Sequence, residues 1–150
     1  MPMPQKLLGN EYWVTTVCID SYDNGVPCGQ FYNPFLEAPQ EFHSLTEFLI
    51  MMECTLDTMR LPQAFAAPRS FGPSPVYKPG KPVSVIHHGK KATLALTVRF
   101  RQHNSWQGTV TWLEAGKKQS FRSVLELVVL MDSALRSSEY PEQSGKAALA

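Results

Sequence analysis

Two glutamates are the side chains best suited to proton transfer, because they occupy matching places in two similar segments. Glu47 lies in FHSLTEFL and Glu126 lies in FRSVLELV. Paired carboxylates can act as general acid and base. Each glutamate, however, follows a serine by three positions, which is the capping-box pattern of a helix N-terminus. We therefore expect Ser44 and Ser123 to accept the amide three residues on, and each glutamate to accept the serine amide. We predict no catalytic residue.

The histidines and cysteines do not have the spacing of metal ligands. His87 and His88 are adjacent on an expected strand, so they point to opposite faces. His43 and His103 lie in separate segments, and the three cysteines contain no Cys-x-x-Cys pair. The chain also has no glycine-rich phosphate loop, G-x-S-x-G elbow or H-E-x-x-H motif. We predict no metal site and no cofactor.

The stretch 60–91 has six basic residues and no acid, with Phe65, Phe71 and Tyr77 between them. Cations that follow phosphates and aromatic rings that stack on bases suit single-stranded nucleic acid. The alternative, which the net charge of +1 favours, is that this stretch lies across the N-terminal part, where residues 1–59 hold eight acids and one lysine. The nucleic-acid candidates are Lys78, Lys81, Lys90, Lys91, Arg99 and Arg101.

Protein contact is indicated by a tryptophan and by two wide apolar helices. Trp106 lies in the turn sequence NSWQG, where an exposed indole is a hot-spot candidate, unless it folds back to cap the sheet. The runs 48–52 and 127–131 are apolar at five consecutive positions, which is more than one helix face needs. Either the two helices pack on each other or they meet a partner. The interaction candidates are Trp106, Ile50, Met51, Val129 and Leu130.

These side chains belong to two segments that match in register. Residues 42–59 and 121–138 share Phe, Ser, Glu, Met and Leu at the same spacing. The matched pairs are Phe42/Phe121, Ser44/Ser123, Glu47/Glu126, Met52/Met131 and Leu56/Leu135. Gly29 and Gly108 precede the two phenylalanines by the same interval. We interpret the pattern as a duplicated unit of a β-hairpin and a helix.

The predicted fold class is α+β, with two ββα repeats. An antiparallel sheet of four or five strands packs on one face against two helices. In residues 92–102, Leu94, Leu96, Val98 and Phe100 alternate with Thr93, Thr97, Arg99 and Arg101, so the second set should face water. Strands are expected at 11–20, 29–36, 83–88, 92–102 and 109–114, and helices at 44–59 and 123–137.

One domain, residues 1–150, is expected to hold all of these elements. Repeat one covers about 11–59 and repeat two about 83–137. Between them, residues 60–82 carry six prolines and form a connector. The tail 138–150 is expected to be disordered. Scattered cysteines and the lack of a long apolar run predict a cytoplasmic protein with no membrane partner. The uneven charge predicts that the two halves attract each other.

Residues 105–135 resemble a pattern in small uncharacterised bacterial proteins. In that pattern a hairpin ending in Gly-x-Val leads through a glycine turn to Phe-x-Ser-x-x-Glu-Leu. The match covers about a fifth of the chain. The first repeat departs from it, with Asn33-Pro34 where the second has Trp112-Leu113. The resemblance implies a ββα architecture and a bacterial or mobile-element origin, and it assigns no residue a role.

The function predicted from these observations is a non-enzymatic protein-interaction module. It would be a small bacterial or mobile-element accessory protein, and one version is an inhibitor of a host defence or nuclease complex. Its partner would be another protein or a second copy of the chain. The alternative is a nucleic-acid-binding accessory protein that uses the basic, aromatic stretch 60–101.

Overall fold

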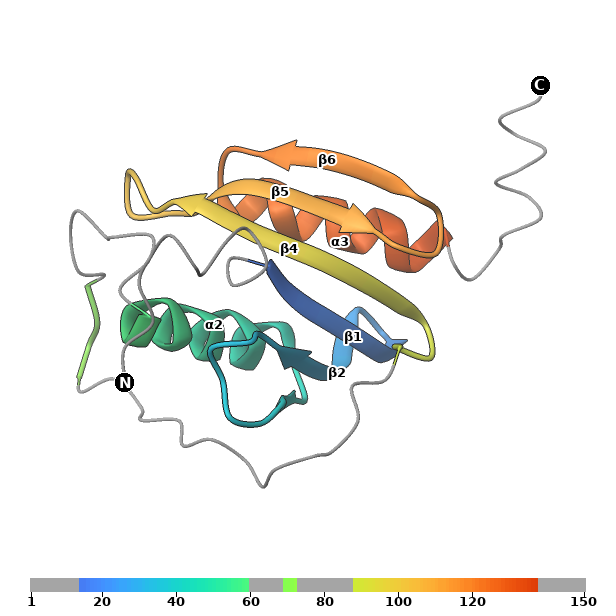
Figure 1. Cartoon of the computed structure of the whole chain (residues 1–150), viewed down its shortest axis with the longest axis horizontal. Coiled ribbons are helices and arrows are strands. Elements are labelled where there is room, and N and C mark those ends of the chain that lie inside the picture. The colour runs from blue at the N-terminus through green and yellow to red at the C-terminus, as the bar shows by residue number, and fades with distance from the viewer. Residues whose placement is uncertain (1–13, 60–68, 73–87, 138–150) are drawn as a thin grey trace.

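The computed structural model describes residues 14–59, 69–72 and 88–137, which form an α+β fold (Figure 1). The described residues contain six strands, which join in one antiparallel sheet, and two helices. The N-terminal half contains β1 (Val14–Asp23), β2 (Val26–Tyr32), β3 (Gln40–Phe42) and α2 (Leu45–Met59). The C-terminal half contains β4 (Ala92–Phe100), β5 (Gln107–Trp112), β6 (Lys117–Phe121) and α3 (Val124–Ser137). The predicted fold class is confirmed.

The sheet contains one strand in each half that the sequence does not predict. Its order is β3-β2-β1-β4-β5-β6, so each helix follows three strands and the unit is βββα rather than ββα. The two unpredicted strands, β3 and β6, are the edges of the sheet. β3 has only three residues, and four of the five residues of β6 are exposed, so neither shows an alternating apolar pattern. The strand predicted at 83–88 lies outside the described residues except for His88, which is not in a strand.

The glycines and phenylalanines that match in the sequence also pair in the sheet. Gly29 on β2 pairs with Phe42 on β3, and Gly108 on β5 pairs with Phe121 on β6. A Cβ atom on Gly29 would lie 1.9 Å from the carbonyl oxygen of Cys18, and one on Gly108 would lie 1.9 Å from that of Thr97. Both positions therefore require glycine, because the neighbouring backbone approaches closely.

The two halves meet at the central strands β1 and β4. We call two residues equivalent when they are separated by the same number of positions in the sequence as Phe42 and Phe121. Thr16 and Ala95 are equivalent, and they pair with each other across this boundary. On either side, Thr15 pairs with Leu96, the equivalent of Val17, and Val17 pairs with Leu94, the equivalent of Thr15. The strand pairing therefore has a local two-fold axis through the Thr16–Ala95 pair.

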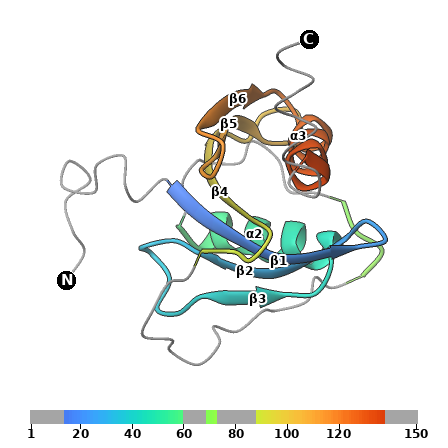
Figure 2. The same ribbon diagram turned by 90° about the vertical axis from the view of Figure 1, so that its right-hand side faces the viewer.

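Both helices cover the same face of the sheet (Figures 1 and 2). α2 packs on β2 and β3, and α3 packs on β5 and β6. Buried residues of both halves form one core cluster, which includes Ile19, Leu96 and Leu127. Within it, the rings of Phe31 and Phe48 meet edge to face with their centroids 5.6 Å apart. Neither described helix has the length and apolar character needed to cross a bilayer.

A β-bulge between Val98 and Phe100 changes which side chains of β4 are buried. A bulge adds one residue to a strand, so the side chains beyond it exchange faces. Phe100, predicted to lie in the core, is 55% exposed, and Arg101, predicted to face water, is 5% exposed. Both predictions are wrong for this reason. Thr93, predicted to face water as well, is buried at the start of the strand.

Candidate functional site

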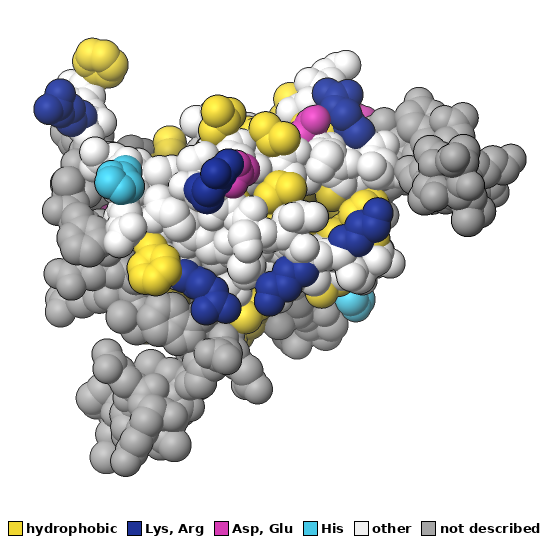
Figure 3. All heavy atoms as spheres, turned by 90° about the horizontal axis from the view of Figure 1, so that it is seen from above, with side chains coloured by type: hydrophobic (Ala, Val, Ile, Leu, Met, Phe, Trp, Pro, Cys, Tyr) yellow, Lys and Arg dark blue, Asp and Glu magenta, His cyan; other side chains and the backbone are white. Residues whose placement is uncertain are grey.

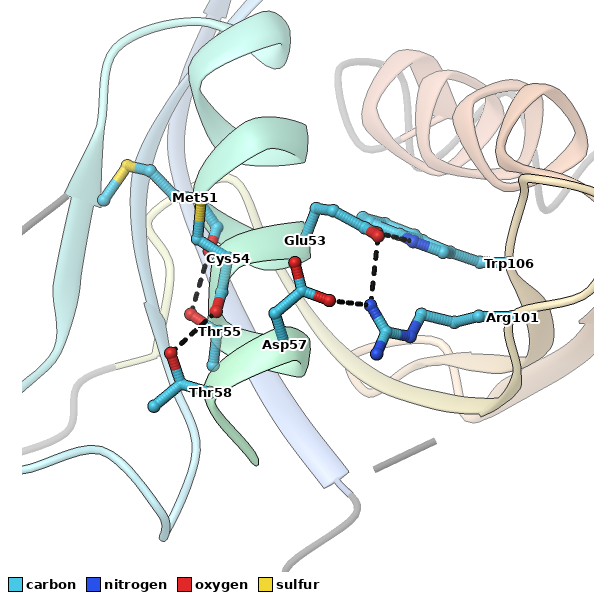
Figure 4. Close-up of polar contacts among 8 residues, drawn as sticks. All are labelled: Met51, Glu53, Cys54, Thr55, Asp57, Thr58, Arg101 and Trp106. Carbon is cyan, nitrogen blue, oxygen red and sulfur yellow. Dashed lines mark hydrogen bonds and ion pairs between the residues drawn. The ribbon is translucent and has the colours of Figure 1, made fainter. Parts of the chain in front are cut away.

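Arg101 and Trp106 lie where the C-terminal half meets helix α2. Arg101 follows β4 and Trp106 precedes β5, and both side chains point toward Glu53 and Asp57 on α2 (Figure 4). Arg101 Nη1 donates to Glu53 Oε1 at 3.0 Å and to Asp57 Oδ1 at 2.7 Å. Trp106 Nε1 donates to Glu53 Oε2 at 2.5 Å. Glu53 thus uses both carboxylate oxygens to hold the β4–β5 connection against α2.

Two predicted contact residues are therefore structural. Trp106 is 3% exposed, so its predicted place as an exposed hot spot is wrong, and the alternative that it folds back into the protein holds. Arg101 cannot extend a basic surface, because its side chain is buried between two carboxylates. These ion pairs join two acids of the N-terminal half to one cation of the C-terminal half.

The two matching glutamates cap helices, as the capping-box pattern predicts. Ser44 Oγ accepts the amide of Glu47 at 3.1 Å, and Ser123 Oγ accepts that of Glu126 at 3.1 Å. The return bond differs in detail, since each glutamate accepts the amide of the residue before the serine. His43 N donates to Glu47 at 3.1 Å, and Arg122 N donates to Glu126 at 2.9 Å. These bonds satisfy amides that the helix leaves free.

Helix α3 presents exposed apolar side chains on its outer face. Val129, an interaction candidate, is 57% exposed, and Leu125 four residues before it is 73% exposed. Figure 3 shows hydrophobic side chains on this side of the molecule between paired basic and acidic groups. The flanking pairs are Arg122–Glu126 at 2.9 Å, at the start of α3, and Arg136–Asp132 at 2.9 Å within it, each between residues four apart. We call Leu125 and Val129, with these two ion pairs, the α3 surface.

The other helix candidates lie elsewhere. Ile50 on α2 is at the margin of exposure at 36%, and Leu130 packs partly against the core. Met51 is buried, so the prediction that it meets a partner is wrong. Leu125 is not among the predicted interaction residues, because it lies outside the uninterrupted apolar run 127–131. Its spacing of four residues from Val129 is the signal that marks it.

The described cations of the basic stretch do not gather in one place. Lys78 and Lys81 lie outside the described residues. Lys90 is exposed and Lys91 half-buried just before β4, whereas Arg99 is exposed near the end of the same strand. A strand rises about 3.3 Å per residue, so Lys90 and Arg99 are separated by roughly 30 Å. Nothing in this arrangement concentrates charge at a single groove.

A polar group at the start of β4 has structural partners. Thr93 N donates to Glu114 Oε1 at 2.6 Å, and the Thr93 hydroxyl accepts the Gly89 amide at 3.0 Å. Cys18 pairs with Thr93 in the sheet. Burial, followed by the nearby carboxylates of Asp20 and Glu114, raises the pKa of the Cys18 thiol, which disfavours the nucleophilic thiolate. Among the described residues, no three His, Cys, Asp or Glu side chains are placed to hold a metal ion.

Comparison of the chain with protein-family models, with curated proteins and with solved structures found no match. The likeness of residues 105–135 to small bacterial proteins therefore stays a resemblance of sequence.

Proposed function

We propose that the protein is a non-enzymatic interaction module that binds another protein through the α3 surface. The observation that carries this proposal is the exposure of Leu125 and Val129, four residues apart on one face of a helix. Residues at this spacing are neighbours on a helix, so they form a continuous apolar stripe. Helices that dock in grooves use anchors at this spacing. Burying one such side chain contributes about 1.5–3 kcal/mol.

The partner is a different protein with an apolar groove. Such a groove accepts the stripe of Leu125 and Val129 and leaves the Arg122–Glu126 and Arg136–Asp132 ion pairs intact at its rim. A second copy of this chain is the other occupant that the test distinguishes.

The edges of the sheet do not favour partner binding by strand addition. β3 is three residues long, and the other edge strand, β6, presents Lys117 and Lys118. Short edges and edge lysines are the features by which proteins prevent pairing with another chain. The helix surface is the better docking site.

Site-specific crosslinking followed by reconstitution tests the proposal. A photoreactive residue is placed at position 125. The matched control carries it in place of Ile50 on α2, the residue equivalent to Val129. The partner protein that crosslinks from position 125 and not from position 50 is purified. Its affinity for the original chain and for each variant is then measured. We expect Leu125→Ser and Val129→Ser each to weaken binding at least tenfold, and Ile50→Ser to change it less than twofold, with all three variants folded.

Three outcomes would overturn this assignment. If the purified partner binds the Leu125→Ser and Val129→Ser variants as tightly as the original chain, the α3 surface is not the docking site. If the species crosslinked from position 125 disappears on nuclease treatment, the chain binds nucleic acid instead. A concentration-dependent dimer that both substitutions abolish would show that the occupant is a second copy.

A further inference from the structure

A cavity of about 210 Å³ lies between helix α3 and strands β4, β5 and β6. Leu94, Val110 and Met131 form its apolar wall, beside the indole of Trp112. Lys117 and Gln119, both exposed on β6, line it as well. An apolar cavity of about 150 Å³ in another protein accepts benzene, so this one has room for a ring-sized group. The cavity lies on the inner side of α3, away from Leu125 and Val129.

The equivalent place in the N-terminal half has different side chains. The positions equivalent to Trp112, Lys117 and Gln119 are Asn33, Ala38 and Gln40, and all three are buried. Their polar atoms are satisfied by the protein itself. Asn33 Oδ1 accepts the Phe35 amide at 2.7 Å, and Gln40 Nε2 donates to the Ala38 carbonyl at 3.1 Å. The side chains at these matched positions thus differ in size, charge and exposure between the two halves.

Two polar groups that line the cavity, one on Trp112 and one on Lys117, lack a hydrogen-bond acceptor or an ion-pair partner among the described residues. Trp112 Nε1 is covered from solvent and has no hydrogen-bond acceptor, whereas Trp106 Nε1 donates to Glu53. Buried N–H groups in proteins usually have a partner. Lys117 forms no ion pair among the described residues, although other cations of this half do. An apolar wall beside an unpaired ammonium group fits an anion attached to an apolar body.

We propose that this cavity binds a small monocarboxylate with an aryl or branched alkyl body. The body occupies the space beside Trp112 and Met131, and the carboxylate pairs with the Lys117 ammonium group. Recognition of this kind fixes orientation by charge and gains affinity from apolar contact. The equivalent place in the N-terminal half lacks this cation, because Ala38 stands where the C-terminal half has Lys117.

Phenylacetate, with its neutral analogue phenylacetamide, is a suitable probe. The indole N–H signals of Trp112 and Trp106 can be followed by NMR during titration, after assignment with Trp13→Phe and Trp112→Phe, since the chain has three tryptophans. We expect phenylacetate to shift the Trp112 signal saturably and to leave the Trp106 signal unchanged. Phenylacetamide should bind at least tenfold more weakly, because it lacks the charge that pairs with Lys117.

Two lysine variants separate a specific site from general charge. Lys117→Gln should lower phenylacetate affinity at least tenfold, to the level of phenylacetamide. Lys118→Gln, at the next residue on the opposite face of β6, should leave it within twofold, and the Trp106 signal reports folding in both. Ala134→Leu, which places a larger side chain in the cavity wall, should abolish the Trp112 shift.

The proposal fails if saturating phenylacetate leaves the Trp112 signal in place. It also fails if phenylacetamide binds equally well, or if the two lysine variants lose the same affinity. None of these results depends on the α3 surface, so they leave the proposed protein interaction unaffected.

Discussion

Tyr22 and Arg101 are equivalent residues, and each fastens its own half to the helix of the other half. Arg101, after β4, donates to Glu53 on α2. Tyr22, near the end of β1, donates its hydroxyl to Asp132 Oδ1 on α3 at 2.5 Å. Glu53 and Asp132 are themselves equivalent. Each contact follows a β-bulge, at Ile19–Ser21 in β1 and at Val98–Phe100 in β4, which turns the side chain toward the helices.

The two contacts use different chemistry at the same place. On α2, Glu53 and Asp57 are both acidic, and the cation that balances them comes from Arg101. On α3, the position equivalent to Asp57 is Arg136, which pairs with Asp132 on the same helix at 2.9 Å. The crossing residue there can be a neutral tyrosine, because α3 already carries its own cation.

Removing the Glu53 carboxylate should destabilise the fold more than removing that of Asp57. Glu53 is 26% exposed and accepts from both Arg101 and Trp106, whereas Asp57 is 59% exposed and accepts only from Arg101 among the bonds described. We expect Glu53→Leu to cost about 3 kcal/mol and Asp57→Leu about 1 kcal/mol. Unfolding in urea measures both. Equal losses would show that Glu53 does not hold the junction.

The Tyr22–Asp132 contact should be visible in an acid titration. The Tyr22 hydroxyl, and after it the Arg136 guanidinium, lower the pKa of Asp132 below its usual value of 3.8. Because the folded-state pKa is the lower one, this group stabilises the fold above the unfolded pKa. The contribution is lost as the pH falls through the folded pKa. Carboxyl ¹³C shifts of Asp132 should therefore titrate below pH 3.8.

Tyr22→Phe is the matched variant for that titration. Without the hydroxyl, the pKa of Asp132 should rise toward its ordinary value while Arg136 still holds it down. Part of the acid sensitivity of folding should disappear with the hydroxyl. An unchanged Asp132 titration in Tyr22→Phe would show that the hydrogen bond is absent in solution.

The serine caps should contribute to stability and not to partner binding. Ser44→Ala and Ser123→Ala each remove the acceptor of one helix amide, so each should cost about 1 kcal/mol. Thermal unfolding measures the loss, and the affinity for the partner of the α3 surface should stay within twofold. A serine variant with full stability and no binding would return Glu47 and Glu126 to the functional candidates.

Alanine at Gly29 or Gly108 should strongly destabilise the sheet. A Cβ atom there would overlap a backbone carbonyl oxygen of the neighbouring strand, which cannot move without breaking the ladder. We expect a loss of more than about 3 kcal/mol for each substitution. Gly72→Ala is the control, because its Cβ atom would meet nothing within 4 Å. Mild effects at both sheet positions would contradict the close approach of the strands.

The helices and the capping serines could be predicted from the sequence because their signals are local. A serine three residues before a glutamate, followed by an apolar stripe, marks a helix start within one turn. β4 was predicted up to Val98 for the same reason, since alternation holds until the bulge. Beyond it Phe100 and Arg101 exchange faces, and nothing local in the sequence marks the extra residue.

The candidate site depended on contacts that are distant in sequence. Trp106 is buried because Glu53, on the helix of the other half, accepts its N–H. β6 gave no strand pattern because it is an edge with polar side chains on both faces. No local sequence pattern and no single distant contact predicts the cavity. It depends on how Trp112 and Lys117 differ from their equivalents, Asn33 and Ala38.

The pairing of Thr16 with Ala95 makes each half a partner for a copy of itself. Two identical chains that met in this way would form a closed, symmetric dimer with the same sheet, and every surface would then occur twice. A single chain removes that restriction. One half can carry Leu125 where the other carries Thr46, and one can line a cavity with Trp112 and Lys117 where the other buries Asn33 and Ala38. Covalent linkage thus permits two different surfaces on one symmetric framework.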